Sequence, residues 1–281
     1  MLKSRIHPAW IVAGITFGTL FATAGFRSAP SVLILPLEED FGWRRDVISL
    51  AVAINVLLYG LTAPFAAALM ERFTVRKVVM AALTTVGTGA LLTIWMSQSW
   101  HLMLLWGVVV GVGTGSMALV FAATIANRWF VKSRGLVVGI LTAAAASGQL
   151  VFLPGLSKLA QDPGWRASSL VIALGAYLMV PLIFFFLKED PQSIGTTPYG
   201  ADEDWTPPVL QKTNAAKNAI DTLKAASKVR NFWFLVGSFF VCGLSTSGLI
   251  GTHFIPAAHD HGMPVVTAAS LLALIGVFDV V

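Results

Sequence analysis

The stretch Leu102–Ala126 reads LMLLWGVVVGVGTGSMALVFAATIA and contains no charged residue. A helix that crosses a bilayer needs about 20 mostly apolar residues, because the hydrocarbon core is roughly 30 Å thick and each residue rises by about 1.5 Å. This stretch is long enough to cross a membrane as one helix. Its glycines Gly107, Gly111 and Gly115 recur every fourth residue, which predicts a face without side chains. Such a face allows close packing of another helix, or sliding along it.

Seven other segments are apolar over a similar length. They are Trp10–Leu37, Val47–Met70, Val75–Met96, Leu136–Leu159, Ser168–Leu187, Phe232–Pro256 and Val265–Val281. Six of the eight predicted spans precede a polar stretch from Lys188 to Arg230, and two follow it. We therefore expect an all-α membrane protein whose chain crosses the bilayer many times.

The composition supports a membrane location. Hydrophobic residues make up 56% of the 281 residues, charged residues only 12%, and the mean hydropathy is +0.76. A soluble domain carries about 25% charged residues, so the apolar excess must contact lipid. The formal charge of +5 does not indicate a nucleic-acid partner, because the basic residues concentrate in the loops of one membrane side. A single cysteine, Cys242, excludes an internal disulfide, and we predict no cofactor, metal site or enzymatic activity.

The distribution of lysine and arginine predicts the orientation. The N-terminal lead, the loops after the second and fourth spans, and the polar linker hold fourteen of them, whereas the alternate loops hold four. Since short cytoplasmic loops carry the excess of positive charge, we expect the N-terminus and the linker to be cytoplasmic, in a plasma or inner membrane. The second half of the linker predicts a basic amphipathic helix, which suits either a membrane surface or a solvated connection.

Arg27 lies in the middle of the first predicted span, close to Phe26 and Ala29. A charged side chain there costs about 2.5–3.5 kcal/mol on insertion scales, so it normally faces a cavity or a partner. We hypothesise that Arg27 faces a central cavity and binds an anionic substrate, since its planar guanidinium matches a carboxylate. A structural ion pair would also explain it, as would a side chain that reaches the interface along a helix unwound near Pro30.

Other polar residues within the spans are weaker candidates. Asp279 lies in the last span, where it could take up and release a proton or pair with Arg27. The candidate substrate-binding residues besides Arg27 are Asn55, Tyr59, Gln149 and His253. The first two share one face of a helix because they are four residues apart. Each of these side chains could instead bond to a neighbouring helix.

The loop between the second and third spans carries a motif. Residues 67–77 read AALMERFTVRK and resemble the signature G-x-L-x-D-R-x-G-x-R-R/K of the major facilitator superfamily, a family of membrane transporters. Ala67 and Thr74 stand where the family has glycine. The positions that match, or that keep the charge, are Leu69, Glu71, Arg72, Arg76 and Lys77. In the family this loop is a conformational clamp between helix ends and does not bind substrate, and the resemblance implies the same role here.

Two further segments resemble the monocarboxylate-porter and oxalate/formate-antiporter group of the superfamily. They are LPLEEDFGW at residues 35–43 and RWFVKSRGL at residues 128–136. The resemblance implies a secondary active transporter of small organic anions, driven by protons through alternating access. Asp279 resembles the acidic residue linked to proton coupling, and Arg27 the basic residue of the first helix. An efflux carrier for drugs or amphiphiles would share the fold, and a non-transporting receptor or membrane enzyme is the alternative of another class.

The superfamily plan predicts three parts. Residues 1–188 would form the N-terminal six-helix half, 189–230 the cytoplasmic linker, and 231–281 the first two helices of the C-terminal half. Since that plan has about six helices in each half, we expect the chain to be a fragment of a longer protein. A native product of 29.9 kDa, the mass of this chain, would contradict that expectation.

Overall fold

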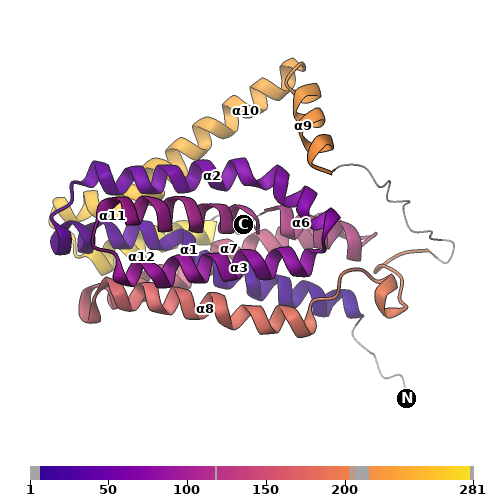
Figure 1. The fold of residues 1–281 in the computed structure, drawn as a ribbon, viewed down its shortest axis with the longest axis horizontal. Coiled ribbons are helices and arrows are strands. Elements are labelled where there is room, and N and C mark those ends of the chain that lie inside the picture. The colour runs from indigo at the N-terminus through magenta and orange to yellow at the C-terminus, as the bar shows by residue number, and fades with distance from the viewer. Residues whose placement is uncertain (1–6, 118, 203–204, 206–214, 279–281) are drawn as a thin grey trace.

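The computed structural model describes residues 7–117, 119–202, 205 and 215–278. In this part of the chain the regular elements are helices, and only an isolated bridge between Phe130 and Tyr199 pairs backbone in the manner of a strand. Figure 1 shows the long helices side by side, with the N-terminus and the linker at one end. The predicted all-α membrane bundle is confirmed.

The α-helices of the described residues are α1 (Pro8–Phe41), α2 (Arg45–Arg72), α3 (Val75–Leu92), α4 (Ser99–Leu102), α5 (Gly111–Gly115), α6 (Leu119–Trp129), α7 (Arg134–Leu159), α8 (Trp165–Phe186), α9 (Ala215–Ala226), α10 (Arg230–Cys242), α11 (Gly251–Asp260) and α12 (Val265–Phe278). Shorter helical segments extend or join them. They are the 3-10 turns Thr93–Trp95 and Gln192–Ile194 and the π-helical segments Met103–Val110, Ala160–Gly164 and Gly243–Ile250.

The predicted spans correspond to these helices or to runs of them. The run Ser99–Trp129 contains α4 to α6, and the run Arg230–Asp260 contains α10 and α11. The run Arg134–Phe186 has 53 residues and contains two predicted spans. One straight helix of that length would measure about 80 Å, more than twice the hydrocarbon thickness. The chain breaks at Gly164, whose φ of 99° is outside the helical region, so α7 and α8 are separate crossings.

Alternate loops gather at opposite ends of the bundle. We call the end that carries the N-terminus and the linker the linker end, and the opposite end the distal end (Figure 1). At the linker end, Glu189 contacts both Val75 and Arg128. At the distal end, Arg45 contacts Asp260. The basic loops therefore lie together at one end, as their charge distribution predicted.

The glycine face of the run Ser99–Trp129 packs directly on α2. A Cβ added to Gly111 would lie 3.0 Å from the Cα of Asn55, and one added to Gly115 would lie 2.6 Å from the carbonyl oxygen of Tyr59. No side chain fits at Gly115, so this face serves the close packing that the spacing predicted. α1 occupies the centre of the bundle, where it contacts α7, α8 and α11.

The first part of the linker is docked on the linker end. The amide of Tyr199 donates to the carbonyl of Trp129 at 2.8 Å, and the amide of Val131 donates to the carbonyl of Tyr199 at 3.0 Å. The Tyr199 ring also lies edge-on to His7 and Trp10, with centroid distances of 5.4 and 5.6 Å. The second part forms the predicted helix α9, and α10 leans away from the bundle without a buried residue (Figure 1).

Candidate functional site

Arg27 lies well inside the 34-residue α1, between Phe26 and Ser28, which are each 3% exposed. These buried neighbours set the rotation of the helix, and the side chain of Arg27 itself stays exposed. Its guanidinium carbon Cζ lies over the ring of Tyr59 on α2, 5.1 Å from the ring centroid. The structure thus brings together two of the predicted site residues from two helices.

The contact with Tyr59 uses only part of the hydrogen-bonding capacity of Arg27. A cation over an aromatic ring gains about 0.5–1 kcal/mol at an exposed site and about 2 kcal/mol when desolvated. The guanidinium has five N–H donors, and a ring contact uses few of them. Among the residues that the structure describes, Arg27 forms no ion pair with a carboxylate. Within this described part of the chain, the partner that the structure gives to the Arg27 charge is the Tyr59 ring.

Asn55 lies one helical turn before Tyr59 and takes part in helix packing. Its Nδ2 donates to the backbone carbonyl of Trp106 at 2.7 Å. Its backbone also lies against Gly111 of the facing helix. The structure therefore gives Asn55 the bond to a neighbouring helix that was the alternative to substrate binding. A substrate contact through its side-chain oxygen stays a prediction.

Gln149 and His253 lie half-buried on α7 and α11, which both pack against α1. Gln149 follows Gly148, whose backbone lies against Phe21 of α1. In the described part of the chain, neither side chain is hydrogen-bonded to Arg27 or placed on the Tyr59 ring. Their substrate contacts stay predictions. Asp279 lies outside the described residues, and so does its predicted pairing with Arg27.

The loop motif at residues 67–77 makes its turn without glycine. Thr74 has an extended backbone with φ of 174°, and its Oγ1 caps α3 by accepting a hydrogen bond from the Lys77 amide at 3.2 Å. Arg76 packs across the loop, since its Nη1 donates to the carbonyl of Phe184 at 3.4 Å and its Cζ lies 5.5 Å from that ring. The motif side chains that stay exposed are Leu69, Glu71, Arg72 and Lys77.

Glu189 is a residue of the linker end that sequence reasoning missed. Its carboxylate accepts hydrogen bonds from the backbone amides of Val75 at 3.0 Å and Arg76 at 3.4 Å, and it forms an ion pair with Arg128. Val75 and Arg76 open α3, so the carboxylate also lies at the positive end of the helix dipole. The available signal was a carboxylate directly after the sixth span, at an end otherwise rich in lysine and arginine.

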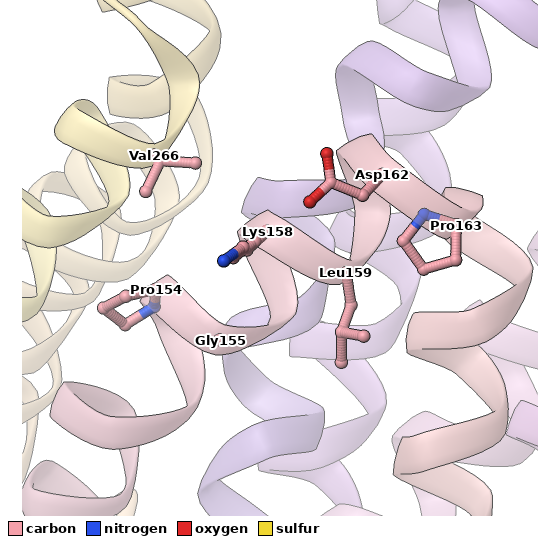
Figure 2. A pocket seen from close by; sticks show the side chains of 7 residues that line it. All are labelled: Pro154, Gly155, Lys158, Leu159, Asp162, Pro163 and Val266. Atoms are coloured by element: carbon pink, nitrogen blue, oxygen red, sulfur yellow. The ribbon is translucent and has the colours of Figure 1, made fainter.

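A groove of about 400 Å³ opens between α7 and α12 at the distal end (Figure 2). Its lining residues are Pro154, Gly155, Lys158, Leu159, Asp162, Pro163 and Val266. Most of this lining is apolar. Its two charged residues are four positions apart, Lys158 on α7 and Asp162 in the turn after it. Neither Arg27 nor Tyr59 lines the groove, so it is separate from the candidate site.

A bundle of long apolar helices with a charge well inside one of them defines a membrane protein of many spans. The chain belongs to the Major Facilitator Superfamily, whose family model matches residues 15–281. It is 23% identical over 281 residues to the uncharacterised transporter YcxA of Bacillus subtilis. This match covers 100% of the present chain and 64% of the relative. It is 27% identical over 279 residues to monocarboxylate transporter 3 of Rattus norvegicus, covering 97% of this chain and 53% of the relative.

Solved structures agree on the fold. The crystal structure of a D-xylose–proton symporter matches with a TM-score of 0.63 at 16% identity, over 97% of this chain and 66% of that one. The xylose transporter from E. coli, in a partially occluded inward-open conformation, matches with a TM-score of 0.62 at 14% identity, over 98% and 71%. The chain spans about half to two-thirds of the length of its curated relatives. The family resemblance is confirmed: this chain is an integral multi-pass membrane protein of a superfamily of transporters, not of enzymes.

Proposed function

We propose that this protein is a secondary active transporter of small organic anions of the monocarboxylate type, coupled to protons and working by alternating access. The observation that carries the proposal is the position of Arg27 within the spanning helix α1, with its guanidinium over the ring of Tyr59 on α2. A charge at that depth is costly unless it meets a partner. A carboxylate is the natural partner, because two of its oxygens match the fork of a guanidinium.

In the proposed site, Arg27 binds the carboxylate while Tyr59 holds the guanidinium from another side. Gln149 and His253 contact the rest of the solute, since their helices α7 and α11 both pack against α1. Asp279 takes up and releases the coupling proton. The name of the rat relative as a monocarboxylate transporter supports the substrate class at 27% identity.

The proposed mechanism moves two halves around this midplane site. Residues 1–188 and 231–281 belong to different halves, and 189–230 is a linker on the cytoplasmic side of a plasma or inner membrane. The gathering of basic loops at the linker end supports this orientation. The contact of Arg76 with Phe184 on α8 supports the clamp role of the loop motif, because it joins the start of α3 to the end of α8.

Uptake of labelled small monocarboxylates into proteoliposomes that hold the complete protein tests the substrate site. Arg27→Ala should lower kcat/KM at least about 30-fold, because loss of one partner of a desolvated charge pair costs about 2 kcal/mol or more. Arg27→Lys should lower it less, since the ammonium keeps the charge without the fork. Tyr59→Leu should lower it about 2- to 30-fold through the lost ring contact.

The matched control is Arg44→Ala. This arginine lies beyond the distal end of α1, not at the depth of Arg27, and its side chain is 82% exposed. Its uptake should equal that of the unmodified protein. Carboxylate uptake that survives Arg27→Ala would remove the anion-binding role. A preference for cationic or neutral amphiphiles over carboxylates would favour an efflux carrier, and uptake that ignores an imposed pH gradient would exclude proton coupling.

A further inference from the structure

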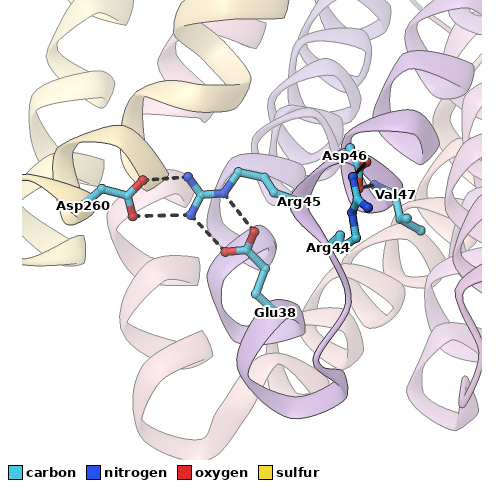
Figure 3. Close-up of polar contacts among 6 residues, drawn as sticks. All are labelled: Glu38, Arg44, Arg45, Asp46, Val47 and Asp260. Carbon is cyan, nitrogen blue, oxygen red and sulfur yellow. Dashed lines mark hydrogen bonds and ion pairs between the residues drawn. The ribbon is translucent and has the colours of Figure 1, made fainter.

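At the distal end, Arg45 pairs with two carboxylates at once (Figure 3). Its Nε and Nη2 donate to the two carboxylate oxygens of Glu38 at 2.8 and 3.0 Å. Its Nη1 and Nη2 donate to the two carboxylate oxygens of Asp260 at 2.7 and 3.4 Å. We call Glu38, Arg45 and Asp260 the distal triad. Each carboxylate is held by two hydrogen bonds, which fixes its orientation as well as its distance.

Three helix ends supply the distal triad. Glu38 lies in the last turn of α1, and this helix ends at Gly42, whose φ of 64° is left-handed and turns the chain back. Arg45 is the first residue of α2 and so returns to the side of Glu38 after a short connection. Asp260 is the last residue of α11 and lies 215 positions from Arg45 in the sequence. Only the folded bundle brings this carboxylate to the arginine.

The pair of Arg45 with Asp260 differs from the other ion pairs of the described residues in what it connects. Those others all lie within residues 38–202, which cover the predicted first half and the beginning of the linker. Among the ion pairs of the part of the chain that the structure describes, the pair of Arg45 with Asp260 is the one that joins that region to residues 231–281, the predicted second half.

The distal triad is partly shielded from water. The side chains of Arg45, Glu38 and Asp260 are 35%, 21% and 47% exposed. The neighbouring pair of Arg44 with Asp46 is 82% and 59% exposed and joins residues only two positions apart (Figure 3). Partial burial reduces the screening of these charges by salt. The carboxylates of Glu38 and Asp260 bind the same guanidinium, and without it they would repel each other. Arg45 therefore holds the ends of α1 and α11 together.

We propose that the distal triad is an ionic latch that closes the distal side of the carrier, and that Arg45 and Asp260 separate whenever the site opens to that side. This inference rests on the proposed function, since it requires two halves that rock against each other. Rocking about a midplane site must part the distal ends of the halves. Glu38 belongs to the same predicted half as Arg45, so it keeps the guanidinium in place in both states.

A reversible crosslink tests whether the latch must open. The complete protein, with Cys242 and any other cysteine replaced, receives Arg45→Cys and Asp260→Cys, and a short bismethanethiosulfonate reagent joins the two positions through disulfide bonds. Uptake in proteoliposomes should fall to the level of protein-free vesicles and return after reduction. Unchanged uptake by the crosslinked protein would overturn the latch, because the two helix ends would then have no need to separate.

The matched control uses Arg44→Cys and Asp46→Cys with the same reagent. This pair flanks Arg45 at the start of α2 and lies in the same view of Figure 3, but both residues belong to one predicted half. Its crosslink should leave uptake unchanged. Equal inhibition of the control would also overturn the latch, since any crosslink at the distal end would then stop the carrier.

A distance measurement tests the latch without any substrate. Spin labels at Glu39→Cys and His261→Cys report the separation of the α1 and α11 ends, since both native side chains are exposed. Asp260→Asn should raise the population of longer distances about two- to fivefold, as expected for a partly exposed ion pair, and Asp46→Asn should leave the distances unchanged. No change with Asp260→Asn would overturn the latch. A failure of carboxylate uptake would count against the proposed function alone, because this measurement does not depend on the solute.

Discussion

At the linker end, the carboxylate of Glu189 contacts Arg128 and the start of α3, whereas at the distal end the guanidinium of Arg45 contacts Glu38 and Asp260. At each end, one partly buried charged side chain therefore binds several partners. The partners of Glu189, which begins the linker, all come from helices of the predicted first half. Those at the distal end come from both predicted halves. The same ion-pair chemistry can therefore make one body rigid or hold two bodies together.

The backbone contributes differently at the two ends. Glu189 accepts two amide hydrogen bonds at the N-terminus of α3, where the helix leaves its first N–H groups without partners. Arg45 makes its contacts through side chains alone. A brace built on backbone amides cannot open without uncapping a helix, whereas an arginine that joins two side chains can release one of them at little cost. The contacts of Glu189 are thus suited to rigidity within one predicted half, and the contact of Arg45 with Asp260 is suited to opening between the halves.

The largest effect on stability is expected for Arg128→Ala. This change leaves the carboxylate of Glu189, which is 23% exposed, without its cation. Loss of one partner costs about 3–5 kcal/mol for a fully buried pair, and about 2 kcal/mol is expected at this partial burial. The Tm of the complete protein in detergent, followed by tryptophan fluorescence, should fall. An unchanged Tm together with shifted distal distances would reverse the roles of the two ends.

A smaller loss is expected for Glu189→Gln. The amide oxygen of glutamine still accepts a hydrogen bond from the start of α3, but the charge that favours both the helix dipole and Arg128 is gone. We expect the free energy of unfolding to fall by about 1 kcal/mol, measured by the same fluorescence method. In parallel, Asp260→Asn should shift the distal distances and leave the Tm nearly unchanged.

The smallest effect is expected for Asp202→Asn. Its carboxylate is 85% exposed and lies 3.4 Å from the Nζ of Lys132, which is 68% exposed. Exposed pairs of this kind contribute little, so the free energy of unfolding should change by less than about 0.5 kcal/mol. This variant is the matched control for the linker end. A loss as large as that of Arg128→Ala would mean that any charge change at this end destabilises the fold.

Part of the candidate site followed from the sequence. Arg27 stood out because an isolated charge in an apolar span is expensive, and Tyr59 was a candidate by its position on the next span. The sequence could not show that these two side chains meet, since the contact depends on how α1 and α2 rotate against each other. It also left two roles open for Asn55, and the structure shows the bond to the facing helix at Trp106.

The spans, their alternation between two ends and the gathering of basic loops were determined by the sequence itself. The reason is that lipid acts on each segment separately, so about 20 apolar residues or a cluster of lysines have their effect wherever the chain places them. The capping of α3 by Glu189 and the contact of Arg45 with Asp260 depend on how the helices pack in the folded bundle. Those pairs join residues 114 and 215 positions apart, and their partners are selected by helix packing, which no local pattern encodes.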